Sequence, residues 1–199
     1  MLTIVRSDVD AVVAARVTAD DLASFEGDGY RYDLLQGDLI RVSPAGFRHG
    51  RLAHEISGHL WVFLDAHPEL RLVAVGAETG FRLGREPDTV LGPDAAVVCL
   101  DRLPPTQAQI GFLELAPDLA IEIVSPTDRW TTVSGKVEAY LSAGVQLVWV
   151  IEPSLRAIRV YSSEGAEQRL QADRGDVLQA PGRLPGFRLV LSELFEATR

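Results

Sequence analysis

The sequence is short of several residue types, and each shortage narrows the class of protein. It has one cysteine, Cys99, so no disulfide bond can form within the chain, which favours a reducing compartment. No apolar run is long enough to span a bilayer, and Asp8 and Asp10 interrupt the region where a signal peptide would be apolar. We therefore expect a cytoplasmic protein without a membrane segment.

Basic residues are also scarce. The chain has 19 lysines and arginines against 28 aspartates and glutamates, a formal net charge of −9. This charge disfavours unspecific binding to nucleic acids, because phosphate contacts dominate that affinity. Residues 39–54 are an exception, since they include three arginines and two histidines but no acidic residue. We expect a local basic surface there, with Arg48, His49 and Arg51 as candidate nucleic-acid contacts.

Lysine is the rarest basic residue, because Lys136 is the only lysine in the chain. Arginine evidently supplies the surface charge of this protein, so we interpret the single lysine as chemically specific. The alternative is a solvated lysine on a helix surface, which is what most lysines are. Arg129, next to Trp130, is a further candidate contact to a nucleic acid, because arginine and aromatic side chains together bind bases and phosphates.

The apolar residues predict alternating helices and strands. They recur at helical spacing over 47–67, ahead of Pro68, and a second long helix is predicted over 131–142. Short helices are predicted at 18–25 and from Ser192. A hairpin over 30–42 turns at Gln36-Gly37 or Gly37-Asp38. Strands are predicted at 70–75, 79–83, 94–100, 118–124, 147–151, 157–161 and 168–170. The pattern is typical of an α/β fold with a mixed β-sheet flanked by helices.

Two carboxylates occur in neighbouring apolar strands. Asp94 opens one run and Glu122 lies inside the next. An ionised carboxylate in such a run is costly unless a cation or hydrogen bonds compensate it. Residues of a strand alternate between its faces, so Glu122 shares a face with Asp118 and Ala120. We interpret Asp118, which follows a proline, as a strand-entry residue rather than as part of a site.

Asp94 and Glu122 together predict a site for Mg²⁺, with Mn²⁺ as an alternative ion. Mg²⁺ prefers oxygen ligands and uses few protein carboxylates. Lys136 follows Glu122 closely enough in sequence to fold back over its strand. Its charge would stabilise a phosphate substrate or help to activate the attacking water.

Longer motifs surround these residues. They are Gly92-Pro93-Asp94, then residues 117–126 with Glu122, then Lys136 and Tyr140, then Gly144-Val145 and residues 148–153. The hairpin 32–39, Ser43-Pro44 with His49, and the ending 184–187 with Leu194-Phe195 accompany them. In this order the motifs resemble the Uma-two family, restriction-type endonucleases of the PD-(D/E)XK superfamily. The resemblance covers roughly residues 17 to 196, and it implies a single domain over 1–199 with residues 1–16 as an N-terminal extension.

The resemblance also implies roles for individual residues. It assigns Asp94 and Glu122 to the metal ion and Lys136 to catalysis. The superfamily lysine stands two residues after the acidic residue, where this chain has Val124. In the Uma-two family the lysine comes from the following helix, at the place of Lys136. Family members usually carry glutamate where this chain has Asp33 and Asp38.

The implied function is a Mg²⁺-dependent endonuclease that hydrolyses phosphodiester bonds in DNA, with a restriction-endonuclease-like core. A homodimer is expected from the resemblance alone. Two alternatives remain open at this point. One is a catalytically inactive nuclease-fold module that binds protein or nucleic acid, which the net charge and Val124 favour. The other is a metal-dependent hydrolase of a small phosphoester, which the acidic charge would tolerate.

Overall fold

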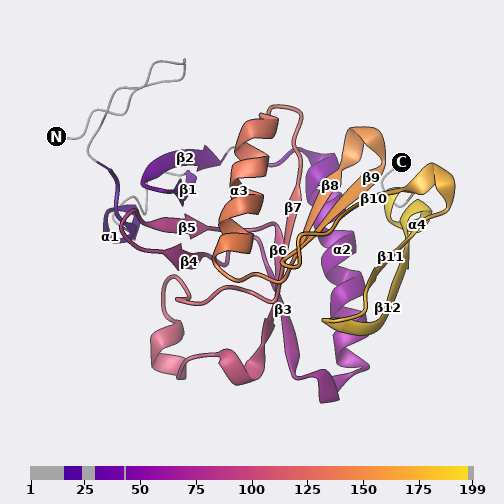
Figure 1. Ribbon diagram of the computed structural model, residues 1–199, viewed down its shortest axis with the longest axis horizontal. Helices are drawn as coiled ribbons and strands as arrows, with labels where there is room; N and C mark the ends of the chain where they lie inside the picture. Colours follow the sequence, from indigo (N-terminus) through magenta and orange to yellow (C-terminus); the bar gives the residue numbers. More distant parts are fainter. Residues whose placement is uncertain (1–15, 24–29, 43, 197–199) are drawn as a thin grey trace.

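The computed structural model describes residues 16–23, 30–42 and 44–196, with only the backbone of residues 23, 107 and 108. Apart from Arg16, the expected N-terminal extension lies outside this part of the chain. The described residues form helices and strands in three sheets (Figure 1). The fold is mixed α/β, and none of its described helices is long and apolar enough to cross a membrane.

The largest sheet carries the residues of the predicted site. Its strands are β3 (Leu72–Gly76), β6 (Ala95–Cys99), β7 (Leu119–Ile123), β8 (Leu147–Glu152), β9 (Ala157–Ser162) and β10 (Glu167–Gln171). These six strands lie in the order β10-β9-β8-β7-β6-β3. The pair β7–β8 is parallel and the other pairs are antiparallel, so the sheet is mixed as predicted. Helix α3 (Trp130–Ser142) connects the two parallel strands.

Helix α2 (Phe47–Asp65) covers one face of this sheet. Its buried residues are Leu52, Ile56, Leu60 and Leu64, whose four-residue spacing places them on one side of the helix. They share a core with Ile121 of β7. The hairpin of β11 (Val177–Ala180) and β12 (Leu184–Val190) and the helix α4 (Leu191–Glu196) contribute to the same core.

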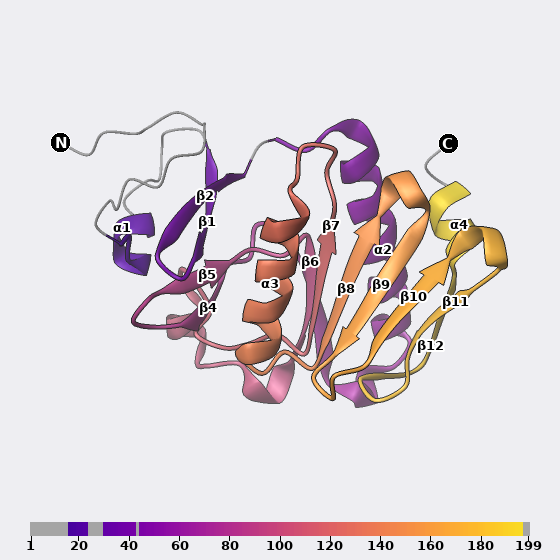
Figure 2. The ribbon, with the colours of Figure 1, turned by 45° about the horizontal axis from the view of Figure 1, so that its top comes forward.

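Helix α3 and a second sheet cover the opposite face (Figure 2). This sheet comprises β1 (Arg31–Leu35), β2 (Asp38–Val42), β4 (Phe81–Gly84) and β5 (Thr89–Leu91), and its strands are antiparallel in the order β2-β1-β5-β4. Val133, Val137 and Tyr140 of α3 pack on Ala120 of β7. The strand β1 contacts α3, which brings the hairpin close to the single lysine.

Local signals in the sequence position the N-terminal elements. Thr18 and Asp21 form a capping box, in which each side chain accepts the backbone N–H of the other residue. It starts α1 (Ala19–Ala23), and residues 24 and 25 of that predicted helix lie outside the described residues. The β1–β2 hairpin turns at Gln36-Gly37, both with positive φ, as two-residue hairpin turns of this type require.

Three strands, β5, β11 and β12, escaped the sequence prediction. Strand β5 has only three residues, too few for an alternating pattern. Strand β12 contains Pro185 and Gly186, which usually interrupt strands, and its pairing with β11 shifts register between Gln179 and Ala180. The other predicted strands are present with boundaries that differ by one or two residues, and α2 ends two residues before the predicted end.

Candidate active site

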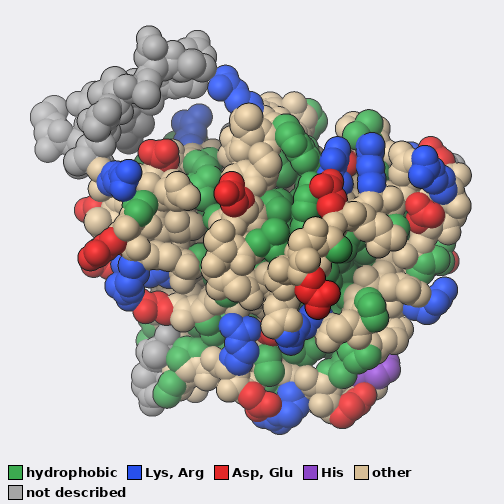
Figure 3. Space-filling model, in the orientation of Figure 1, with side chains coloured by type: hydrophobic (Ala, Val, Ile, Leu, Met, Phe, Trp, Pro, Cys, Tyr) green, Lys and Arg blue, Asp and Glu red, His purple; other side chains and the backbone are tan. Residues whose placement is uncertain are grey.

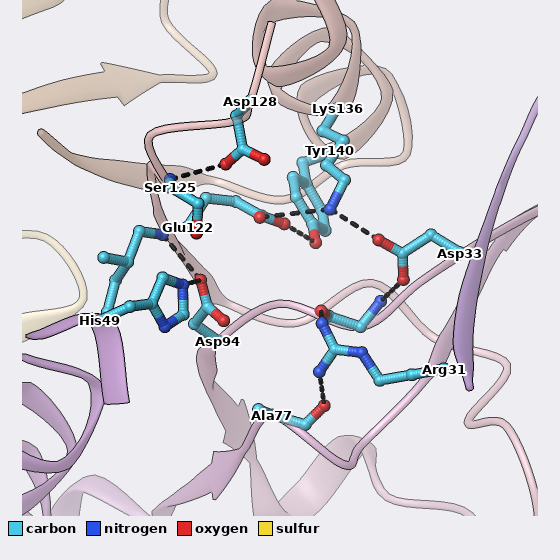
Figure 4. Close-up of polar contacts among 12 residues, drawn as sticks. Arg31, Asp33, His49, Ala77, Asp94, Glu122, Ser125, Asp128, Lys136 and Tyr140 are labelled. Carbon is cyan, nitrogen blue, oxygen red and sulfur yellow. Dashed lines mark hydrogen bonds and ion pairs between the residues drawn. The ribbon is translucent and has the colours of Figure 1, made fainter. Parts of the chain in front are cut away.

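The structure brings Asp94 and Glu122 to the same end of two paired strands. Ala95 of β6 lies opposite Ile121 of β7, so Asp94 stands beside Glu122 at the end of the pair. The backbone N–H of Ile123 donates to Asp94 Oδ2 at 2.7 Å, and that of Asp94 donates to the Ile121 carbonyl at 2.9 Å. The first hydrogen bond holds the Asp94 carboxylate against the residue that follows Glu122 (Figure 4), and the second holds its backbone against β7.

Glu122 projects from β7 towards α3, on the face that strand alternation predicts. The Tyr140 hydroxyl donates to its Oε1 at 2.7 Å, and Lys136 Nζ lies 3.3 Å from its Oε2. Lys136 and Tyr140 are four residues apart, so they lie on the same side of the helix and reach one carboxylate together. The three predicted catalytic residues, Asp94, Glu122 and Lys136, therefore belong to one cluster.

Asp33 is a member of this cluster that the sequence analysis did not select. It is 1% exposed, and its Oδ2 lies 2.6 Å from Lys136 Nζ. Its Oδ1 accepts the backbone N–H of Gly92 at 3.0 Å. Asp33 thus connects the lysine to the turn that carries Asp94. The sequence does contain a signal that could have identified Asp33. Like Glu122, it is a carboxylate in a strand of mainly apolar residues.

Arg31 supports the same region from the same strand. Its Nη1 donates to the Ala77 carbonyl at 2.6 Å, and its Nη2 donates to the Gly92 carbonyl at 3.4 Å. The turn at Gly92 is therefore held from two sides by β1, through its N–H and through its carbonyl. A Cβ atom at Gly92 would make ordinary van der Waals contacts, 3.5 Å from the Ala77 carbonyl oxygen and 3.7 Å from Asp33 Oδ1.

The cluster contains more negative than positive charge, and this perturbs its protonation. Burial raises the pKa of the Glu122 carboxyl to about 7, and Asp94 and Asp33 add to this effect, whereas Lys136 opposes it. Burial also opposes the charge of Lys136, but Glu122 and Asp33 outweigh it and raise the lysine pKa above its ordinary value. Lys136 is therefore an ammonium at neutral pH. Burial and the same carboxylates raise the pKa of Tyr140, which stays a hydrogen-bond donor.

His49 is the candidate nucleic-acid contact that lies closest to the carboxylates. It belongs to the first turn of α2, and its Nε2 lies 3.3 Å from Asp94 Oδ2. The hydrogen bond to Asp94 raises the pKa of His49 against the effect of burial. Because α2 and α3 lie on opposite faces of the sheet, His49 and Lys136 approach the two carboxylates from opposite sides.

The three arginines predicted to contact nucleic acid make no direct contact with Asp94 or Glu122 among the interactions of the described residues. Arg48 Nη2 donates to the Pro153 carbonyl, just after β8, at 2.8 Å. Arg51 pairs with Glu55 one turn further along α2, at 2.5 Å. Arg129 is exposed at the residue preceding α3. All three stand near the helix starts that flank the carboxylates, and Arg48 and Arg51 already have partners in the protein.

Asp118 lies at the other end of β7 from Glu122. It is 2% exposed, its Oδ2 accepts the backbone N–H of Cys99 at 2.8 Å, and it pairs with Arg102 and Arg183. These contacts fit the structural role predicted for Asp118.

The donor set suits an ion that takes few protein ligands. Among the described residues, no group of three or more His, Cys, Asp or Glu side chains is arranged to hold a metal. The candidate ligands are the two carboxylates of Asp94 and Glu122. Asp94 Oδ1 accepts no hydrogen bond from the described residues. Burial raises the pKa of Glu122, and so does the negative charge of Asp94 and Asp33, which a bound cation would offset. One or two carboxylates, with the remaining positions left to water and phosphate, is how Mg²⁺ is usually bound. The residues fit this ion.

The fold resembles that of a solved protein from Anabaena variabilis, described as "a putative nuclease belonging to DUF820". The two share 20% sequence identity, the similarity covers 92% of this chain and 99% of the other, and the TM-score is 0.79. The fold that the two proteins share is mixed α/β, with a mixed sheet flanked by helices. No curated protein matches the sequence. The model of the Uma2 family, described as "Putative restriction endonuclease", matches residues 19–192. The chain belongs to the Uma2 family.

Proposed function

We propose that the protein is a Mg²⁺-dependent endonuclease that hydrolyses phosphodiester bonds in DNA. The observation that carries the proposal is the position of Lys136, whose ammonium group stands between the carboxylates of Asp33 and Glu122. A buried cation next to two site carboxylates, at the end of paired strands, is suited to a substrate that is itself an anion. Membership of the Uma2 family supports the same class of reaction.

Each residue of the cluster has a distinct task in this proposal. Asp94 and Glu122 would hold the Mg²⁺ ion. When bound, such an ion lowers the pKa of a water ligand and polarises a phosphate. Lys136, charged at neutral pH, stabilises the negative charge that develops on the phosphate but does not remove a proton from water. Tyr140 orients Glu122, and Asp33 positions Lys136.

The direct test is a cleavage assay on single-stranded, linear duplex and supercoiled DNA, with Mg²⁺, with Mn²⁺ and with EDTA. We expect cleavage with either metal and none with EDTA. Glu122→Gln should abolish the activity, whereas Glu138→Gln, on the exposed side of α3, should leave it unchanged. Absence of cleavage of every DNA form, or cleavage that survives Glu122→Gln, would contradict the proposal.

A catalytically inactive nuclease-fold module is the second candidate, and the valine at position 124 favours it. In such a module Lys136 would serve only to neutralise Asp33 and Glu122. A metal titration separates the two candidates, because an inactive module has no need of both Asp94 and Glu122 to bind Mg²⁺ or Mn²⁺. The homodimer and the cytoplasmic location stay predictions.

A further inference from the structure

Two aromatic side chains stand exposed at the helix starts that flank the carboxylates. Phe47, the first residue of α2, is 90% exposed, and Trp130, the first residue of α3, is 42% exposed. His49 links the start of α2 to Asp94, and α3 carries Lys136 to Glu122. Phe47 is thus two residues from His49, and Trp130 is six residues before Lys136, on helices that cover opposite faces of the sheet.

The ring of Trp130 packs against an arginine. The guanidinium of Arg159 in β9 lies 4.5 Å from the centre of its ring, a cation–π contact that restricts both side chains. Arg159 of β9 lies opposite Val150 of β8, and Val150 in turn lies opposite Glu122 of β7. The stacked pair thus stands on the same face of the sheet as Glu122, two strands away.

The charges around the site are too few for a duplex to be held mainly through its phosphates. Duplex binding usually draws on several phosphate contacts, and the whole chain has a net charge of −9. Arg51 pairs with Glu55, and Arg159 pairs with Glu152 and Glu167. Acidic and basic side chains lie intermixed over β9 and β10 (Figure 3). Stacking on aromatic side chains needs no net charge, but it requires bases that are not paired.

We propose that the substrate of this site is an unpaired DNA segment, whose bases stack on Phe47 and Trp130 on either side of the scissile phosphate. The inference rests on the proposed nuclease function. Arg48 and Arg129, at the same helix starts, contact the phosphates of the DNA strand. The specificity for unpaired DNA follows because a base inside a duplex presents no free face to a side chain.

The test compares binding of fluorescently labelled oligothymidylate and of a duplex of the same length, about 16 nucleotides, in EDTA so that nothing is cleaved. We expect the single strand to bind more tightly at equal salt. Phe47→Ala and Trp130→Ala should each weaken single-strand binding roughly 5- to 150-fold, the effect of losing one stacked base, and leave duplex binding unchanged. Trp61→Ala is the matched control, because Trp61 is 63% exposed in the other half of α2 and should not matter.

A second readout covers the case in which Trp130→Ala disturbs the local fold through Arg159. In a Trp61→Phe background the remaining tryptophans are Trp130 and the buried Trp149. Oligothymidylate should quench part of the fluorescence in this background and none in the Trp61→Phe/Trp130→Phe variant, whereas Trp130→Phe should retain most of the single-strand affinity. Tighter binding to the duplex, or wild-type affinity of both alanine variants, would overturn the inference while leaving the nuclease function intact. Failure to bind or to cut any DNA form would overturn both.

Discussion

Lys136 Nζ lies 2.6 Å from Asp33 Oδ2 and 3.3 Å from Glu122 Oε2, so the single lysine is closer to the hairpin carboxylate than to the strand carboxylate. In the proposed mechanism, Lys136 on α3 takes the place of the lysine that the superfamily has at position 124. Only the position of the ammonium matters to a phosphate, and Asp33 fixes that position from the second sheet.

Replacing Lys136 tests its role in the reaction. Lys136→Met keeps the apolar stem and removes the charge, and we expect the cleavage rate to fall by about 10²–10³-fold, as for other groups that stabilise charge in a transition state. Single-turnover rates at saturating Mg²⁺ measure the effect. Val124→Lys in this background should restore part of the rate, since residue 124 projects from the same strand face as Glu122. Wild-type rates for the single variant would refute the proposed role.

Replacing Asp33 tests whether it positions the lysine. Asp33→Asn keeps an oxygen for the Gly92 N–H but removes the charge opposite Lys136. We expect kcat to fall by roughly 10- to 100-fold with little change in KM, because a hydrogen bond to a charged group is worth about 1.5–3 kcal/mol. Asp33→Glu should recover part of the rate if the carboxylate reaches the lysine. Asp38→Asn, an exposed aspartate of the same hairpin, is the control and should behave as wild type.

The raised pKa of Glu122 predicts how stability depends on pH without metal. The folded pKa of about 7 exceeds the ordinary value of 4.5, so the folded state holds this proton more tightly than the unfolded state. The resulting stabilisation is fully present below pH 4.5 and is lost as the pH rises through 7, on the order of 3 kcal/mol in total. Urea unfolding in EDTA between pH 4 and pH 8, about the span over which both states titrate, measures it.

Glu122→Gln isolates this effect, because glutamine cannot titrate. The difference in unfolding free energy between wild type and Glu122→Gln should therefore shift in favour of the variant as the pH rises. Glu138→Gln, exposed on α3, should show no such shift. A difference that does not change with pH would mean that the pKa of Glu122 is the same in the folded and the unfolded state.

Metal binding should depend on the carboxylates at one end of β7. We expect Asp94→Asn and Glu122→Gln each to weaken Mn²⁺ binding by more than about 10-fold. Even replacing a residue that only hydrogen-bonds to a metal ligand typically lowers metal affinity by about 10–100-fold. Isothermal titration calorimetry gives the affinities. Asp118→Asn provides the control, because Asp118 is a buried carboxylate at the opposite end of the same strand. An equal loss of Mn²⁺ affinity in Asp118→Asn would mean that the substitutions weaken binding by disturbing the fold and not by removing a metal ligand.

Charge reversal should reveal the basic surface at the start of α2. In the double variant Arg48→Glu/Arg51→Glu we expect weaker DNA binding, with a salt dependence shallower by roughly 0.7–0.9 for each phosphate that the variant no longer binds. Binding measured at several salt concentrations gives this slope. Arg71→Glu, beyond the far end of α2, removes an exposed ion pair with Asp101 and should leave the slope unchanged. An unchanged slope in the double variant would make Arg48 and Arg51 ordinary surface residues.

The sequence by itself determined the local structure of this protein and part of its site. The spacing of apolar residues predicted α2, and the alternation along β7 correctly placed Glu122 on the face opposite Ile121. The cost of burying a charge singled out Asp94 and Glu122, because that cost depends on each residue's own strand. Short or interrupted strands such as β5 and β12 were not predicted, because their residues show too little periodicity.

Tertiary structure alone decided which distant residues meet. Asp33 reaches Lys136 because the second sheet packs beside α3, and no periodicity within β1 encodes that contact. The same holds for Arg48, whose partner is the Pro153 carbonyl beyond β8. Local periodicity reports which face of an element is buried, whereas the partner on that face depends on the packing of elements far apart in the chain.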